Sequence, residues 1–111
     1  MKRKLRKLED LFVGQRGKLI ESLVEGNLAR LLQERGIDVQ RTSQRVKSFY
    51  RGKQIEIDIL AFNRRDVVAV EVKTSLWVED VKDFIEELKF FKKAFLEYRD
   101  KNIYGAIAFC G

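Results

Sequence analysis

Residues 55–75 read IEIDILAFNRRDVVAVEVKTS, and the rest of the predicted fold is built around them. It predicts two β-strands rich in Ile and Val, joined by a polar turn over residues 63–66. Alternation along the first strand puts one set of side chains on each face: Ile55, Ile57, Ile59 and Ala61 on one, and Glu56, Asp58, Leu60 and Phe62 on the other. The second strand carries Glu71 and Lys73 among valines. Charge on a half-buried strand is costly unless it is paired or binds a metal ion, so these side chains need an explanation.

A short turn favours antiparallel pairing of the two strands, which would set Asp58 beside Glu71, with Lys73 two residues further along the same face. Two close carboxylates repel each other, and a divalent cation relieves that repulsion. Hard oxygen ligands without Cys or His nearby favour Mg²⁺ or Mn²⁺ over Zn²⁺. A lysine beside such a site can orient a water or stabilise the charge that develops on a phosphate. The combination suits hydrolysis of a phosphodiester.

The order Asp58, twelve residues, then Glu71-Val72-Lys73 resembles the signature of the PD-(D/E)XK nuclease superfamily. This superfamily has the restriction-endonuclease-like fold and includes Holliday-junction resolvases and uncharacterised prokaryotic members. The resemblance extends over residues 17–111. One departure is Ile57, which stands where the superfamily signature has a proline before the aspartate.

The resemblance implies a Mg²⁺- or Mn²⁺-dependent DNA endonuclease. In that interpretation Asp58 and Glu71 ligate the metal, the backbone carbonyl of Val72 assists, and Lys73 is catalytic together with the two carboxylates. Many members add a glutamate from the first helix, and Glu25 occupies the matching position. Whether Glu25 or Glu56 completes the set stays open.

Three alternatives also stay open. Glu71 and Lys73 can form an exposed cross-strand ion-pair ladder on a sheet with one wet face. The same fold can serve as a nucleic-acid-binding module without catalysis. It can also serve as a protein-interaction subunit, with the N-terminal segment as the contact surface.

The rest of the chain predicts an α/β fold. Residues 18–35 predict a helix that Gly36 ends, residues 37–50 a polar strand, residues 81–98 a second helix, and residues 103–110 an apolar strand. The near-continuous apolar character of the last strand predicts burial on both faces and a parallel neighbour. The order α-β-β-β-α-β, with a central mixed four-stranded sheet flanked by helices, is the minimal core of the restriction-endonuclease-like fold.

Two segments are expected: a basic helical arm over residues 1–16 and a nuclease-like α/β domain over residues 17–111. Resembling proteins usually continue into another helix. Either the sequence is a truncated domain, or a partner subunit covers the side left open. The small sheet favours a homodimer.

The chain has 111 residues, a net charge of +6 and a pI of about 9.6, which favours a polyanionic partner and DNA first among them. A single cysteine, Cys110, and the lack of histidine exclude an internal disulfide, zinc sites and His-based catalysis. No transmembrane or signal segment is apparent, so a cytoplasmic location is expected. The predicted DNA-contacting residues crowd the strand before the acidic pair and the turn after it: Arg41, Arg45, Lys47, Arg51 and Lys53.

Overall fold

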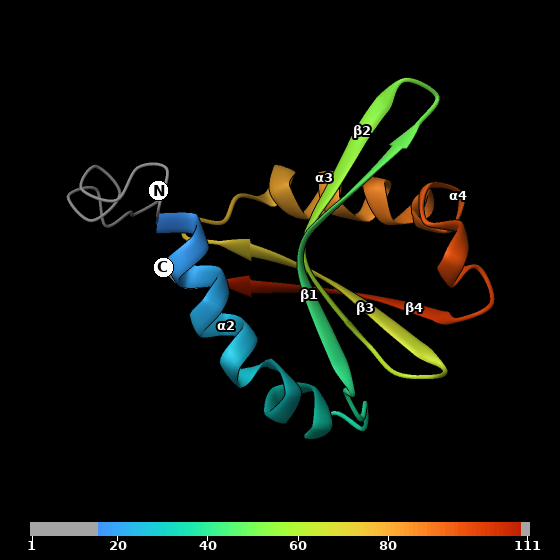
Figure 1. Ribbon diagram of the computed structural model, residues 1–111. Helices are drawn as coiled ribbons and strands as arrows, with labels where there is room; N and C mark the ends of the chain where they lie inside the picture. The colour runs from blue at the N-terminus through green and yellow to red at the C-terminus, as the bar shows by residue number, and fades with distance from the viewer. Residues whose placement is uncertain (1–15, 110–111) are drawn as a thin grey trace.

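The computed structural model describes the backbone of residues 16–109 and the side chains of residues 24–109. Residues 1–15 of the predicted arm, and Cys110, therefore lie outside the described part. The elements follow the expected order (Figure 1): α2 (Arg16–Gln33), β1 (Arg41–Tyr50), β2 (Lys53–Phe62), β3 (Asp66–Lys73), α3 (Val78–Lys89), α4 (Phe91–Ala94), the 3₁₀ turn η1 (Leu96–Tyr98) and β4 (Asn102–Phe109). None of these helices is long and apolar enough to cross a membrane.

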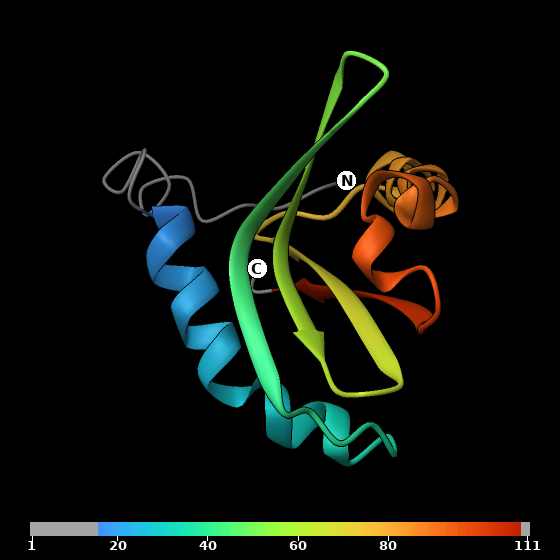
Figure 2. The ribbon, with the colours of Figure 1, turned by 45° about the vertical axis from the view of Figure 1, so that its right-hand side comes forward.

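The predicted α/β class with a mixed four-stranded sheet is confirmed. The sheet has the order β1-β2-β3-β4; the first three strands are antiparallel neighbours, and β4 runs parallel to β3. Figure 2 shows α2 on one side of the sheet and α3 with α4 on the other. The β1–β2 hairpin extends beyond β3 and β4 and projects away from the rest of the sheet.

Local chemistry sets the turns where the sequence predicts them. Gly36 takes a φ of 87° just after α2, the left-handed conformation that ends a helix. Arg51 and Gly52 both have positive φ in the tip of the β1–β2 hairpin, as a tight two-residue hairpin turn requires. Between β2 and β3, the side-chain oxygen of Asn63 accepts hydrogen bonds from the backbone of Arg65 and Asp66.

Two apolar cores lie on the two faces of the sheet. On the α2 side, Leu28 and Leu32 pack on Ile59 and Ala61 of β2 and on Val68 and Val70 of β3. The residues of the opposite core come from β2, β3, α3 and α4: Ile55, Ile57, Leu60, Val67, Ala69, Phe84, Phe91 and Phe95. The sheet therefore separates two environments, called the α2 face and the α3 face below.

The structure corrects the predicted faces of β2. Ile55, Ile57, Ile59 and Ala61 are all buried, but the first two belong to the α3 face and the last two to the α2 face. The change happens at Asp58, opposite Arg45, whose φ of 52° interrupts the regular β1–β2 ladder. A strand that twists sharply at one residue exchanges its faces there, which simple alternation cannot anticipate.

Two further predictions are wrong. The predicted helix over residues 81–98 breaks at Phe90 into α3, α4 and η1, which allows Phe91 and Phe95 to stack at 4.7 Å between ring centroids inside the core. Strand β4 is parallel to β3 as predicted, but it is not buried on both faces. It forms an edge of the sheet, and Tyr104 and Phe109 are about half exposed because the helices leave part of this strand uncovered.

Candidate functional site

The candidate site begins with a fork in the sheet. Strand β2 pairs with β3 only between Ile59↔Val70 and Phe62↔Val67, whereas β3 continues alongside β4 as far as Lys73. Beyond the fork, β2 leaves with β1 in the projecting hairpin (Figure 1). Glu71, Val72 and Lys73 therefore lie on a strand that has lost its neighbour on one side. A strand edge without a partner has backbone groups that must bond elsewhere.

Asp58 occupies this fork. Its Oδ2 atom accepts a hydrogen bond from the backbone N–H of Val72 at 2.8 Å, in place of the missing ladder bond. The N–H and C=O groups of a strand residue point to the same edge, so the carbonyl of Val72 also faces the fork. The structure thus brings Asp58 next to Glu71 and Val72, as the sequence predicts, although by divergence of the strands and not by direct pairing across them.

Glu71 is the most perturbed carboxylate of the described residues. The pKa of Glu71 is raised from 4.5 to about 7. Burial is the largest cause of this rise, the neighbouring Asp58 carboxylate contributes to it, and Lys73 opposes it. Its Oε1 atom is buried and has no hydrogen-bond partner. Buried carboxylate oxygens normally have partners, so an unpaired one in a charged setting indicates a place where a proton or a cation can bind.

Lys73 stands between two carboxylates. Its Nζ atom lies 3.9 Å from Oε2 of Glu71 and 3.8 Å from Oδ1 of Asp80. Asp80 is held in the first turn of α3, where its other oxygen accepts the backbone N–H of Trp77 at 2.8 Å. Since the Lys73 side chain keeps about a third of its surface exposed, it is both anchored and accessible from solvent.

Glu87 of α3 is a member of this group that sequence reasoning missed. Burial raises its pKa; the nearby Asp58 charge adds to the rise, while Lys53 and Lys73 oppose it. Its Oε1 atom, like that of Glu71, is buried without a hydrogen-bond partner. The available signal was its place on the apolar stripe of the helix, three residues after Phe84 and four before Phe91, where a glutamate is out of pattern.

The two other predicted carboxylates lie elsewhere. Glu25 accepts hydrogen bonds from Oγ1 of Thr42 and Nε2 of Gln44, each at 2.6 Å, on the α2 face. Glu56 faces Arg45, whose guanidinium lies 3.9 Å from its carboxylate. The structure does not bring Glu25 or Glu56 into the group formed by Asp58, Glu71 and Glu87.

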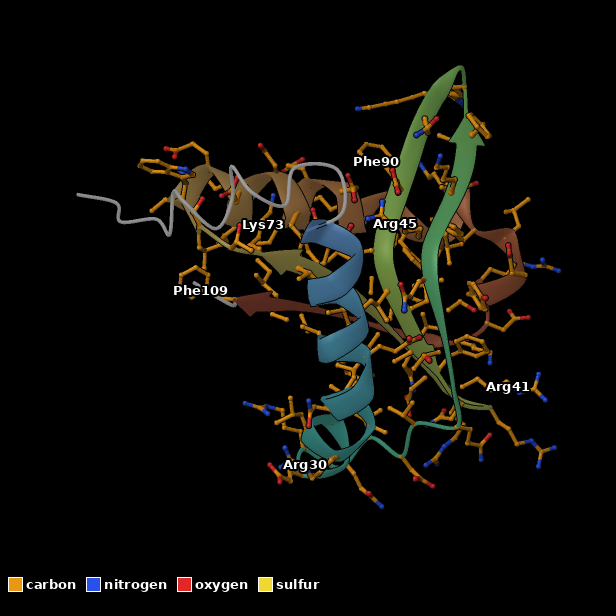
Figure 3. The ribbon with its side chains drawn as sticks, turned by 60° about the vertical axis from the view of Figure 1, so that its left-hand side comes forward. Arg30, Arg41, Arg45, Lys73, Phe90 and Phe109 are labelled. Atoms are coloured by element: carbon orange, nitrogen blue, oxygen red, sulfur yellow. The ribbon has the colours of Figure 1, made fainter. Side chains whose placement is uncertain are left out.

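The five predicted DNA-contacting residues are spread along the hairpin. Figure 3 shows Arg41 at the end of β1 remote from the hairpin tip, and Arg45 in the middle of the strand. Lys47, Arg51 and Lys53 are exposed in the outer half of the hairpin. Lys53 acts on the candidate site through its charge, which opposes the rise in the pKa of Glu87. The basic track is therefore long: its middle, at Arg45, is opposite Asp58, and its outer end, at Lys53, is near Glu87.

The donor set fits a hard divalent cation only in part. In residues 24–109, no three Asp, Glu, His or Cys side chains are grouped closely enough to hold a metal ion among themselves. Oxygen atoms of Asp58, Glu71 and the Val72 carbonyl lie at one place, and the buried Oε1 atom of Glu71 has no hydrogen-bond partner. Mg²⁺ usually binds one or two carboxylates and completes its shell with waters and substrate phosphates, so this set is sufficient in kind.

Comparisons with known protein families, with curated proteins and with solved structures find no match to this chain.

Proposed function

We propose that this chain is a divalent-metal-dependent DNA endonuclease built on a restriction-endonuclease-like core. The observation that carries the proposal is the meeting of Asp58, Glu71 and Lys73 at the fork between β2 and β3. The order of helices and strands supports it, because that order agrees with the minimal core of the fold. The net charge of +6 supports DNA as the partner.

Each residue has a role in this proposal. Asp58, Glu71 and the Val72 carbonyl would hold Mg²⁺ or Mn²⁺, which supplies charge neutralisation and a more acidic water when bound. Lys73 is placed to donate a hydrogen bond to the attacking water or to a phosphate oxygen, because its ammonium group lies beside Glu71. Glu87 adds negative charge behind the site and would orient water through its unpaired oxygen.

The test combines metal binding with cleavage. Mn²⁺ is titrated calorimetrically into the wild-type protein and into Asp58→Asn, in which the amide oxygen still accepts the Val72 N–H. The same proteins are incubated with labelled duplex, flap and four-way-junction DNA in Mg²⁺, Mn²⁺ or EDTA. We expect saturable Mn²⁺ binding and metal-dependent cleavage by the wild type, and neither by Asp58→Asn.

Thermal unfolding of Asp58→Asn provides the folding control. Cleavage that survives in Asp58→Asn, or that persists in EDTA, would remove the assignment. Tight binding of all three DNA forms without any cleavage in Mg²⁺ or Mn²⁺ would favour the second candidate, a nucleic-acid-binding module that does not cut.

That second candidate has one specific observation in its favour. Lys73 forms ion pairs with Glu71 and with Asp80, so it can serve as a structural link between β3 and the start of α3. In this case Lys73→Met would lower the melting temperature and leave DNA binding independent of metal. The nuclease proposal predicts loss of cleavage with little loss of stability, since exposed or half-exposed ion pairs contribute at most about 1 kcal/mol.

A further inference from the structure

A cleft of about 460 Å³ lies between the hairpin tip and α3, next to the candidate site. One wall belongs to the hairpin and includes Tyr50, Arg51 and Lys53. The other wall belongs to the helix and includes Asp83, Glu86 and Phe90. Glu87 also lines the cleft, and the charges of Asp58 and Lys73 act on it, so the cleft is next to the fork.

The helix wall is continuous because of helical spacing. Asp83 and Glu87 are four residues apart on α3, and Phe90 follows three residues later as the residue that ends the helix, so the three lie on one side of it; Glu86 borders them. Phe84, three residues before Glu87, lies on the side of α3 that faces the sheet and is buried in the core. The side facing the cleft therefore holds carboxylates and one aromatic ring, and 46% of the surface of Phe90 is exposed. Figure 3 shows Phe90 beside the hairpin, and Lys73 farther toward the start of α3.

The hairpin wall has the opposite character. Arg51 lies over the ring of Tyr50, with its guanidinium carbon 5.4 Å from the ring centroid, and Lys53 is the partner of Tyr50 across the hairpin. The cleft has cations on one wall and an aromatic ring and carboxylates on the other. Its volume is within the range of about 300–1,000 Å³ that suits small ligands, so the two walls indicate which ligand would fit. It has a negative side, a flat apolar body and hydrogen-bond donors on its far edge.

We propose that this cleft binds an unpaired nucleotide of a single-stranded DNA segment that leads into the candidate site. The phosphate lies on Arg51 and Lys53, the base stacks on Phe90, and amino groups at the base edge donate to Asp83 or Glu86. The bases of a duplex are paired and stacked on each other, so none of them is free to stack on Phe90. The inference rests on the proposed function, because it names the substrate class of the proposed nuclease: DNA with an unpaired strand, such as a flap.

The test measures binding without cleavage. Fluorescence anisotropy in EDTA follows a labelled single strand and a blunt duplex of the same sequence, with wild type, Phe90→Ala and Phe90→Leu. The leucine variant keeps an apolar side chain at the end of α3 but lacks a ring. We expect both variants to lose about tenfold in affinity for the single strand, the scale of one base–aromatic stack, and to bind the duplex as wild type does.

Tyr104→Ala is the matched control, because Tyr104 is also an aromatic residue and is 45% exposed, but it lies on β4, outside the cleft. Equal loss in Tyr104→Ala would overturn the inference, and so would unchanged single-strand affinity in both Phe90 variants. A cleft that instead takes a basic peptide would show oligolysine binding that Asp83→Asn weakens, with no effect of Phe90 on DNA, and that result also overturns it.

The same experiment separates this inference from the nuclease proposal. Loss of single-strand affinity in the Phe90 variants supports the cleft even if the wild type never cleaves DNA. If the wild type cleaves DNA in Mg²⁺ but the Phe90 variants bind single strands normally, the cleft assignment falls and the nuclease proposal stands.

Discussion

The carboxylates on the two faces of the sheet have opposite surroundings. On the α2 face, Glu25 is fully engaged, with one oxygen bonded to Thr42 and the other to Gln44. On the α3 face, Glu71 and Glu87 each keep a buried oxygen without a hydrogen-bond partner, and burial raises the pKa of both. One face stabilises its carboxylate with neutral donors, and the other crowds its carboxylates together.

The difference shows where function is to be sought. A carboxylate with two good donors contributes to stability, and nothing more is needed to explain it. Crowded, partly buried carboxylates weaken the folded state unless a proton or a cation binds there, which is why the proposed metal site is on this face. The predictions below test this contrast between the Glu25 side and the Glu71–Glu87 side.

The largest effect is expected for Lys73→Met. We expect cleavage to fall at least about 100-fold, the scale of removing one preorganised donor from a charged transition state. Mn²⁺ affinity should change little, because methionine removes the ammonium group and leaves Asp58, Glu71 and the Val72 carbonyl in place. Single-turnover cleavage and calorimetry on the same preparations separate the two quantities; equal losses in both would show that Lys73 only supports the fold of the site.

The next prediction compares the two glutamates directly. Glu87→Gln should weaken Mn²⁺ binding about tenfold, because groups around a metal site typically tune affinity by about 10–100-fold. Glu25→Ala should leave Mn²⁺ affinity unchanged and lower the free energy of unfolding by about 1–2 kcal/mol, since Thr42 and Gln44 lose a charged acceptor. Calorimetry and urea unfolding give both numbers. If Glu25→Ala weakens Mn²⁺ binding and Glu87→Gln does not, then Glu25 belongs to the metal site and Glu87 does not.

Much of this arrangement could be predicted from the sequence, since the relevant rules are local. Alternating valines and isoleucines give β2 and β3, Asn63 gives the turn between them, and Gly36 and Gly52 give two chain reversals. The hairpin brings Asp58 near Glu71 and Lys73, although the divergence of β2 from β3 that lets Asp58 bond the Val72 N–H was not predicted. These features require no knowledge of how the helices pack.

The features that were missed depend on long-range geometry. The face change at Asp58 arises from the twist that Arg45 permits with its positive φ, and no sequence pattern marks it. Glu87 is near the site because of the way α3 packs on the sheet, and the contacts of Glu25 with β1 hold that residue away from the site. The helix breaks at Phe90, and after the break Phe91 and Phe95 are both buried in the core; this tertiary packing outweighs the helical spacing of the sequence.

A third prediction concerns stability and pH in the metal-free protein. The pKa of Glu71 is about 7 when folded against an ordinary 4.5, so the folded state holds more protons than the unfolded state between these values. Stability should therefore fall as the pH rises through this window. Glu71→Gln should match wild type near pH 4.5 and exceed it above pH 7, by at least about 1 kcal/mol or roughly 4–8 °C in Tm.

Melting curves in EDTA over that pH range test the sign. If the Glu71 variant is less stable than wild type at high pH, then Glu71 is a paired structural residue, and the contrast between the faces is lost.

The smallest effect is expected on duplex DNA binding, and it tests which end of the basic track faces DNA. Lys53 lies in the hairpin beside the candidate site and acts on Glu87, whereas Arg41 lies at the far end of β1 (Figure 3). If DNA approaches the α3 face at the fork, Lys53→Ala should reduce the slope of log affinity against log salt by about 0.9, one phosphate contact, and Arg41→Ala should leave it unchanged. Equal reductions would mean that DNA follows the whole of β1. A loss confined to Arg41→Ala would place DNA away from the fork, and the acidic group would then face no phosphate at all.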